Sequence, residues 1–187
     1  TWLCKRTSIS GPEEKILGKV IIHGQKYSIR RRSFAHQKPL VAFMLTQNGE
    51  ANSQIRIFDL EKKEFLADSI GAVMFNDSRG VSMTWLPDDK GLLYTQAPPA
   101  TVSSEKYYNG KIKLHITGAD PNSDETVFGV NINEGIRLKD YETPYVYSFN
   151  NSPYIIARIR PGDADNYAFA VHYSKINGKH TPWIKLK

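Results

Sequence analysis

The chain has 187 residues, which is enough for one domain with a sizeable core or for several small repeats. Hydrophobic residues make up 40% of it and charged residues 24%, so the composition excludes an intrinsically disordered chain. The net charge of +6 permits an anionic partner. The only dense basic run is Arg30, Arg31 and Arg32, and we expect it to be a solvated strand edge, because nucleic-acid sites normally combine several such segments.

Cysteine usage and hydropathy limit the remaining classes. Cys4 is the single cysteine, which excludes an intrachain disulfide framework. No apolar run approaches the roughly 18 residues of a membrane helix, and the first residues contain no signal-peptide core. We therefore expect a protein of the cytoplasm, with the periplasm as the alternative, and no membrane or nucleic-acid partner.

Runs of alternating apolar residues, bounded by turn residues, follow one another along the chain and predict β-strands. Residues 12–17 form the first such run. A first unit over residues 27–67 has runs at 27–31, 40–46, 54–60 and 64–67. A second unit over residues 81–128 has runs at 81–85, 92–96, 111–117 and 125–128. A third unit over residues 145–186 has runs at 145–149, 154–159, 167–173 and 182–186.

The hairpin at residues 85–94 shows how the first two strands of a unit are joined. Pro87 presets φ for the first central position of a type I turn, Asp88 and Asp89 can bond their own backbone, and Gly91 suits the turn exit. Short turns occupy the same place in the other two units, at residues 36–39 and 150–153. The loops after the second strands, at 47–53, 97–110 and 160–166, are longer, and such loops on a rigid scaffold usually carry recognition.

Four-stranded units of about 40–50 residues are typical of β-propeller blades. No sustained apolar stripe of helical period competes with this interpretation. We therefore predict an all-β chain, with about three four-stranded antiparallel blades of an incomplete β-propeller spanning residues 1–187. Residues 12–17 would then be the outer strand of a preceding blade. Three blades cannot close a ring, so we expect two exposed blade faces and a homodimer formed through them. Four large residues are expected to pack between blades: Phe43, Phe58, Trp85 and Trp183.

Several of these strands resemble a known family. The segment GVSMTWLPDDKGLLY at residues 80–94 resembles the SWTPDGKGFFY-type segment in the propeller domain of prolyl oligopeptidases. Upstream, LVAF at 40–43 and IRIFDL at 55–60 are similar to strands of that domain. Downstream, YYNGKIKLHITG at 107–118 and DETVF at 124–128 are similar to its KLYYHxLG and DxLVFE segments. The order and spacing agree from about residue 12 to residue 187.

The resemblance implies one part of a larger serine-type endopeptidase. In that family a seven-bladed propeller lies over an α/β-hydrolase domain, and its central tunnel restricts access to short, often Pro-containing peptides. The Ser-Asp-His triad belongs to the hydrolase domain, with the Ser in a Gly-x-Ser-x-Gly-type elbow. This chain has no such elbow. We therefore expect the fragment alone to be inactive, with no catalytic residue and no cofactor, and with the hydrolase domain and short peptides as its partners.

The resemblance also indicates substrate-facing positions. An aromatic residue often precedes the SWTPDGKG strand in the family, and Gly80 or Val81 has that place here. An arginine that can contact the peptide opens the third strand of a later blade, where this chain has Tyr167, with Arg158 and Arg160 nearby as substitutes. These five residues are the predicted substrate contacts.

Other chemistry has little support in the sequence. The acidic segments at 120–125 and 163–166 lack the pattern of an EF-hand loop, and the histidines lack metal-ligand spacing, so no metal site is predicted. We expect all the histidines to be structural or solvated. The alternative to a peptidase propeller is a non-enzymatic propeller that binds a protein or peptide through the loops at 97–110 and 160–166.

Overall fold

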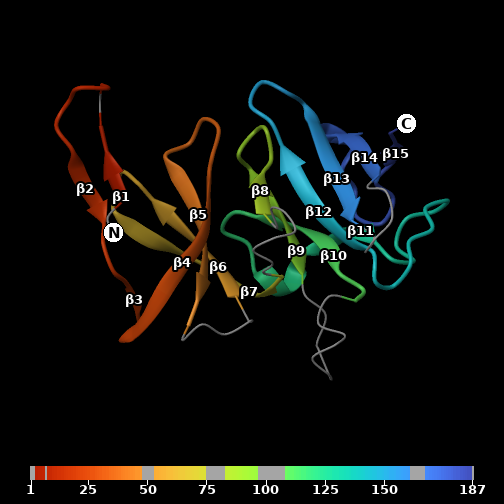
Figure 1. The fold of residues 1–187 in the computed structure, drawn as a ribbon, viewed down its shortest axis with the longest axis horizontal. Coiled ribbons are helices and arrows are strands. Elements are labelled where there is room, and N and C mark those ends of the chain that lie inside the picture. Colours follow the sequence, from red (N-terminus) through yellow and green to blue (C-terminus); the bar gives the residue numbers. More distant parts are fainter. Residues whose placement is uncertain are drawn as a thin grey trace.

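The computed structural model describes residues 3–6, 8–47, 53–74, 83–96, 108–160 and 167–186, and its main elements are β-strands (Figure 1). Within these ranges the helical segments are two short 3-10 turns, η2 (Pro121–Ser123) and η3 (Tyr173–Lys175). None of the described helices is long and apolar enough to cross a membrane. The predicted all-β class is confirmed.

Twelve strands form three antiparallel meanders of four strands each. The first blade contains β4 (Gln25–Phe34), β5 (Leu40–Thr46), β6 (Ser53–Asp59) and β7 (Glu64–Val73). The second contains β8 (Met83–Trp85), β9 (Gly91–Gln96), β10 (Lys111–Ile116) and β11 (Glu125–Gly129). The third contains β12 (Thr143–Ser148), β13 (Tyr154–Arg160), β14 (Tyr167–His172) and β15 (Ile184–Lys185). Each predicted run overlaps one of these strands, and the sheets form a partial, unclosed β-propeller.

The first strands of the three blades lie next to one another (Figure 1). Between β4 and β8, the Trp85 Nε1–H donates to the Ser33 carbonyl at 2.8 Å. Between β8 and β12, the hydroxyls of Thr84 and Ser148 are 2.6 Å apart. These contacts bring the first strands of the three blades together, as a propeller requires.

Strand β7 departs from simple alternation. Its register with β6 shifts, so that Phe58 faces Phe65 and Arg56 faces Ser69, which leaves residues 66–68 opposite Ile57 alone. Such a bulge re-aims side chains. Here it turns Asp68 inward, where it is buried. The sequence predicts the strand only as far as residue 67 and contains no signal for this bulge.

The N-terminal residues cover one face of the first blade. β1 (Leu3–Lys5) pairs with β2 (Glu14–Leu17), which lies in the predicted run 12–17, and β3 (Val20–Ile22) pairs with β4. Ile16 of β2 packs in a cluster with Phe43 and Phe58. The expectation of two exposed blade faces is therefore wrong at this end, because the chain's own N-terminal strands bury the apolar side chains of β5 and β6.

Apolar clusters also fill both junctions between blades. Ala42, Ile57 and Trp85 belong to the cluster between the first and second blades. Phe128, Phe169 and Trp183 belong to the one between the second and third, where the Phe128 and Trp183 rings lie edge to face at 5.0 Å. The four aromatic residues predicted to pack between blades are all buried, but only Trp85 and Trp183 belong to these junctions. The prediction is wrong for Phe43 and Phe58, which pack with the N-terminal strands instead.

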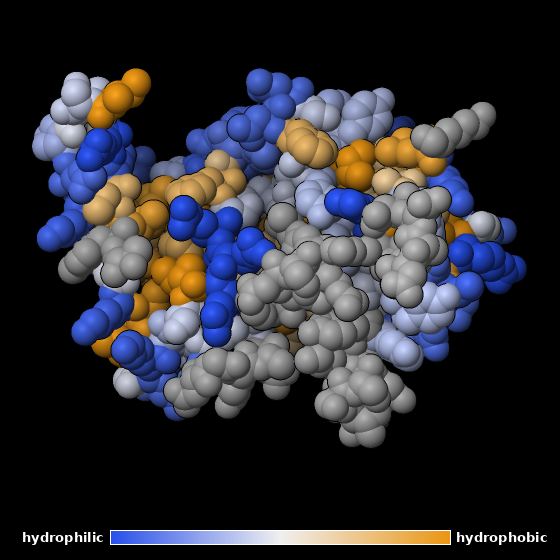
Figure 2. Space-filling view, in the orientation of Figure 1, coloured by the Kyte–Doolittle hydropathy of each residue, from blue (hydrophilic) through white to orange (hydrophobic). Residues whose placement is uncertain are grey.

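The outer part of the third blade, in contrast, is open. Phe149, Tyr154 and Leu186 are exposed, and Ile184 is 69% exposed. Figure 2 shows apolar surface gathered in the region where β14 and β15 lie. This face is an exposed apolar surface, although Ile21 and Phe34 near the first blade are exposed as well.

Candidate functional site

A hollow of about 440 Å³ on the third blade brings two predicted site residues together. Arg158 and Tyr167 both line it, and its other lining residues are Tyr147, Phe149, Ile156, Ala168 and Leu186. The lining is mainly apolar and aromatic, with one cation. Such a surface suits packing against another element or against an uncharged part of a peptide.

The two residues reach the hollow from neighbouring strands. Arg158 lies in β13 opposite Ala168 of β14, and it alternates with the buried Ala157 and Ile159. Strand alternation therefore directs its side chain to the open face of the blade. Tyr167 begins β14 at the end of the blade where β13 finishes and β12 starts.

The Tyr167 hydroxyl is held by a residue that the sequence did not single out. It donates to Glu142 Oε2 at 2.9 Å, and the Lys139 backbone N–H donates to the same oxygen at 2.7 Å. The Lys185 ammonium lies 4.8 Å from the centre of the Tyr167 ring. Burial, followed by the hydrogen bond to Glu142 and its charge, raises the pKa of Tyr167 above its ordinary value. The phenol is thus a fixed donor and not a nucleophile.

The other three predicted contacts are less defined. Gly80 and Val81 lie outside the described residues. The backbone of Arg160 ends β13 opposite Thr143, but its side chain lies outside the description. The recognition loops of the alternative hypothesis, at 97–110 and 160–166, also lie mostly outside it. The structure therefore brings together Arg158 and Tyr167, and adds Glu142 beside them.

The turn at residues 87–90 proves to be a clamp between the first two blades. The Asp89 carboxylate accepts backbone N–H groups from the first blade's turn, from His36 at 2.8 Å, Gln37 at 2.5 Å and Lys38 at 2.9 Å. Asp89 is fully buried and has a left-handed φ of 52°. Burial by itself would raise the pKa of Asp89, but these donors outweigh it and hold the pKa below its ordinary value.

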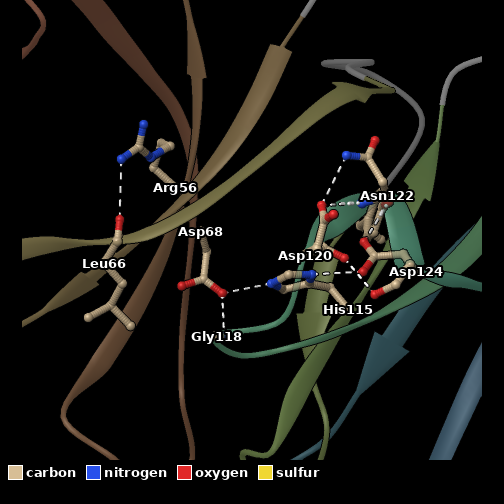
Figure 3. Close-up of polar contacts among 10 residues, drawn as sticks. Arg56, Leu66, Asp68, His115, Gly118, Asp120, Asn122 and Asp124 are labelled. Carbon is tan, nitrogen blue, oxygen red and sulfur yellow. Dashed lines mark hydrogen bonds and ion pairs between the residues drawn. The ribbon is translucent and has the colours of Figure 1, made fainter.

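A second polar cluster joins the same two blades at β7, β9 and β10 (Figure 3). His115 of β10 has its Nε2 2.7 Å from Asp68 Oδ1 and its Nδ1 2.8 Å from Asp124 Oδ1. The Gly118 N–H donates to Asp68 Oδ1 at 2.6 Å, and the Tyr94 hydroxyl donates to Asp124 Oδ2 at 3.0 Å. Burial, then the charge of Asp124, raises the pKa of Tyr94 far above its ordinary value.

One constellation superficially looks like a catalytic triad. His36 Nε2 lies 3.5 Å from Ser148 Oγ, and its Nδ1 lies 3.0 Å from Asn150 Oδ1. However, Thr84 already holds the Ser148 hydroxyl at 2.6 Å, and the neutral amide of Asn150 supplies no charge to stabilise an imidazolium. The arrangement ties the turns of the first and third blades together and does not activate a nucleophile.

The described residues hold no group of three or more His, Cys, Asp or Glu side chains placed to bind a metal ion. The polar clusters around Asp89 and His115 act between blades, and the hollow lined by Arg158 and Tyr167 lies on the third blade. What this arrangement can do is pack and bind; it supplies no acid–base pair around a reactive group.

Comparisons with known proteins agree with this description. A family model described as prolyl oligopeptidase, N-terminal β-propeller domain, matches residues 2–139. No curated protein matches the chain. A solved prolyl endopeptidase is similar to it with a TM-score of 0.74 and 19% identity, covering 100% of this chain and 26% of that one.

Two further structures show the same likeness. Prolyl oligopeptidase B from Galerina marginata, bound to a 35mer substrate, has a TM-score of 0.74 at 13% identity and covers 100% of this chain and 27% of that one. Oligopeptidase B from Leishmania major has a TM-score of 0.68 at 14% identity, covering 98% and 23%. At these identities the likeness shows the fold alone, and the chain spans about a quarter of the length of the solved structures.

Proposed function

The chain belongs to the prolyl oligopeptidase family, as its N-terminal β-propeller domain, and from this premise we propose that it gates substrates for a serine-type peptidase. In this proposal the whole protein hydrolyses short, often Pro-containing peptides. The chemistry comes from an α/β-hydrolase domain that the described residues do not contain. The propeller excludes folded proteins and contacts the peptide.

The observation that carries the proposal is a blade scaffold with no activated nucleophile in its described part. Buried polar clamps at Asp89 and His115 join the first blade to the second, and a size filter requires such fixed junctions between blades. Two Ser–His contacts occur in the described residues. The contact between Ser148 and His36 is long and has no carboxylate behind it. The contact between Ser174 and His172, at 2.9 Å, is a local turn contact in which His172 Nδ1 also accepts the Ser174 backbone N–H. Access control is therefore a better use of this architecture than catalysis.

We further propose that the substrate meets one rim of the blades. Arg160 ends β13, Tyr167 begins β14 and Glu142 immediately precedes β12, so all three lie at the same end of the third blade. We include Gly80 and Val81 in this proposal, because they precede β8, the first strand of the second blade, as Glu142 precedes β12. Arg158 stands two residues deeper in β13, on the open face.

A peptidase assay tests whether the catalytic activity resides outside this chain. The 187-residue chain alone should not cleave a Pro-containing chromogenic peptide, whereas the longer protein that contains it, read through a downstream Gly-x-Ser-x-Gly elbow, should. In the longer protein, Tyr167→Phe should raise KM more than it lowers kcat, because it disturbs binding and not chemistry. Serine-dependent turnover by the 187-residue chain, lost in Ser148→Ala, would contradict the proposal.

The exposed face of the third blade bears on the state of the isolated chain. Ile184 and Phe149 are apolar and uncovered there, and we propose that the isolated chain forms a homodimer through this face. Light scattering over a range of concentrations is the test. A monomer at every concentration would refute the dimer without touching the gating proposal.

A further inference from the structure

The cluster around His115 contains more ionisable groups than packing needs. The His115 side chain is 0% exposed and the Asp68 side chain 2% exposed. Asp68 belongs to the first blade, whereas His115 and Asp124 belong to the second. A buried charge is costly unless it is paired and hydrogen-bonded, so the protonation of this cluster determines whether it stabilises or destabilises the junction.

The donors and acceptors of the cluster determine how many protons its hydrogen bonds need. Asp68 Oδ1 accepts the Gly118 N–H, which can only donate, and Asp124 Oδ2 accepts the Tyr94 hydroxyl. Each ring nitrogen of His115 faces a carboxylate oxygen, at 2.7 and 2.8 Å. A neutral imidazole has one N–H donor, and an imidazolium has two. Two protons are thus needed for the two His–Asp hydrogen bonds.

The surroundings do not offer another source for these protons. The ionisable groups that face His115 are Asp68 from β7, Asp124 before β11, and Tyr94 from β9 through Asp124. The phenol of Tyr94 stays protonated because burial and the charge of Asp124 raise its pKa. It already donates to Asp124, so it relays no further proton to the ring.

We infer that His115, Asp68 and Asp124 form a proton-dependent latch, which holds the first blade to the second while the ring of His115 carries both protons. A ring with a single proton would turn a nitrogen lone pair toward one of the two carboxylates, and the two would repel. A protonated carboxylate oxygen, in turn, would no longer accept from the imidazolium. The latch does not depend on the gating proposal.

The position of Asp68 explains why the latch acts between blades. Its Oδ1 is the single atom that receives both His115 Nε2 and the Gly118 N–H from the second blade. The β7 bulge aims Asp68, and Arg56 donates to the Leu66 carbonyl of that bulge at 3.2 Å. If Asp68 Oδ1 moves away, the Gly118 amide loses its acceptor. Exchange of that amide with solvent therefore reports on the state of the latch.

The first measurement counts protons on the ring. A nitrogen-15 NMR spectrum of the 187-residue chain should show both nitrogens of His115 protonated at neutral pH. Asp68→Asn keeps an acceptor oxygen for Nε2 and Gly118 but removes its charge. We expect the ring of His115 to carry a single proton in this variant, because one of its two carboxylate partners is gone, and hydrogen-exchange protection of the Gly118 amide to fall about tenfold.

Asp120→Asn is the matched control, because Asp120 is a carboxylate in the same segment that caps η2 and bonds Asn122 and not His115. It should change neither the ring nor Gly118. A singly protonated ring in the parent chain at neutral pH would overturn the latch, as would equal effects of Asp68→Asn and Asp120→Asn. If Asp68→Asn fails to fold, Asp124→Asn makes the same change on the Nδ1 side.

Discussion

The turn residue Asp89 allows the sharpest test of how the blades are held together. Asp89→Asn keeps the size of the side chain and its tolerance of the left-handed φ of 52°. It replaces one carboxylate oxygen by an NH₂ group. This group is a donor, so it cannot accept the backbone N–H groups that the oxygen accepted. The donors of His36, Gln37 and Lys38 then compete for one oxygen.

The expected cost follows from these contacts. A hydrogen bond to a charged group contributes about 1.5–3 kcal/mol, and an orphaned buried donor costs about 1–3 kcal/mol. Gln37 and Lys38 lie at the surface, where water can replace part of the loss. We therefore expect Asp89→Asn to lower the free energy of unfolding by about 2 kcal/mol, or roughly 30-fold in the unfolding equilibrium.

The pH dependence has a definite sign. The pKa of Asp89 is lower in the folded chain than in the unfolded one, where it is about 3.9. Its contribution is therefore fully present above the unfolded pKa and is lost as pH falls through the folded one. Asp89→Asn should remove this acid-range component, so the difference between parent and variant shrinks as the pH drops below about 4.

Urea unfolding at neutral and acid pH measures both effects. Asp88→Asn is the matched control, because Asp88 lies in the same turn but contacts only Lys90 of that turn. The Lys90 backbone N–H donates to Asp88 Oδ1 at 3.2 Å, and the Lys90 ammonium lies near the other oxygen. This substitution should change stability by less than about 0.5 kcal/mol. If Asp89→Asn costs no more than Asp88→Asn, the inter-blade clamp does not contribute as the contacts imply.

Three further substitutions probe other contacts. Gly91→Ala should destabilise by about 3 kcal/mol in urea unfolding, because a Cβ there would lie 2.2 Å from the His115 carbonyl oxygen; Gly71→Ala, with open space around it, is the control, and equal costs would refute the clash. Trp85→Phe should lower the free energy of unfolding, obtained from thermal denaturation, by about 2–3 kcal/mol, because it removes the hydrogen bond to Ser33 and leaves a cavity. A loss below about 0.5 kcal/mol, which is typical of surface substitutions, would contradict this. Tyr167→Phe should lower the free energy of unfolding in chemical denaturation by about 1 kcal/mol, because Glu142 then accepts only the Lys139 backbone N–H. An unchanged midpoint would show that the bond from Tyr167 to Glu142 does not stabilise the fold.

Much of the fold could be predicted because its signals are local. Alternation of apolar residues marks each strand within a few residues, and Pro, Asp, Asn and Gly mark the turns between them. The repeat of four strands then indicates blades, and β5 and β13 begin where the predicted apolar runs begin. The strand ends are less accurate: β7 runs to Val73, past the predicted end at 67, because a bulge breaks the period of two.

The candidate site could be predicted only in part. Arg158 and Tyr167 came from the resemblance, and the structure places them around one hollow. Glu142 carries no motif, and only the hydrogen bond from Tyr167 reveals it. The covering of the first blade by β1 and β2 was also not predictable, because a strand pattern shows that a face is apolar but not what lies against it.

The sequence by itself determined the class, the blades and the family of this protein, since these depend on local periodicity and on the order of strands. Only the tertiary structure decided which charges meet. Asp89 is 51–53 residues from the N–H groups that it binds, and His115 is 47 residues from Asp68. Hydrogen bonds depend on distances within about 3 Å, and the chain pattern does not encode such distances until blades pack together.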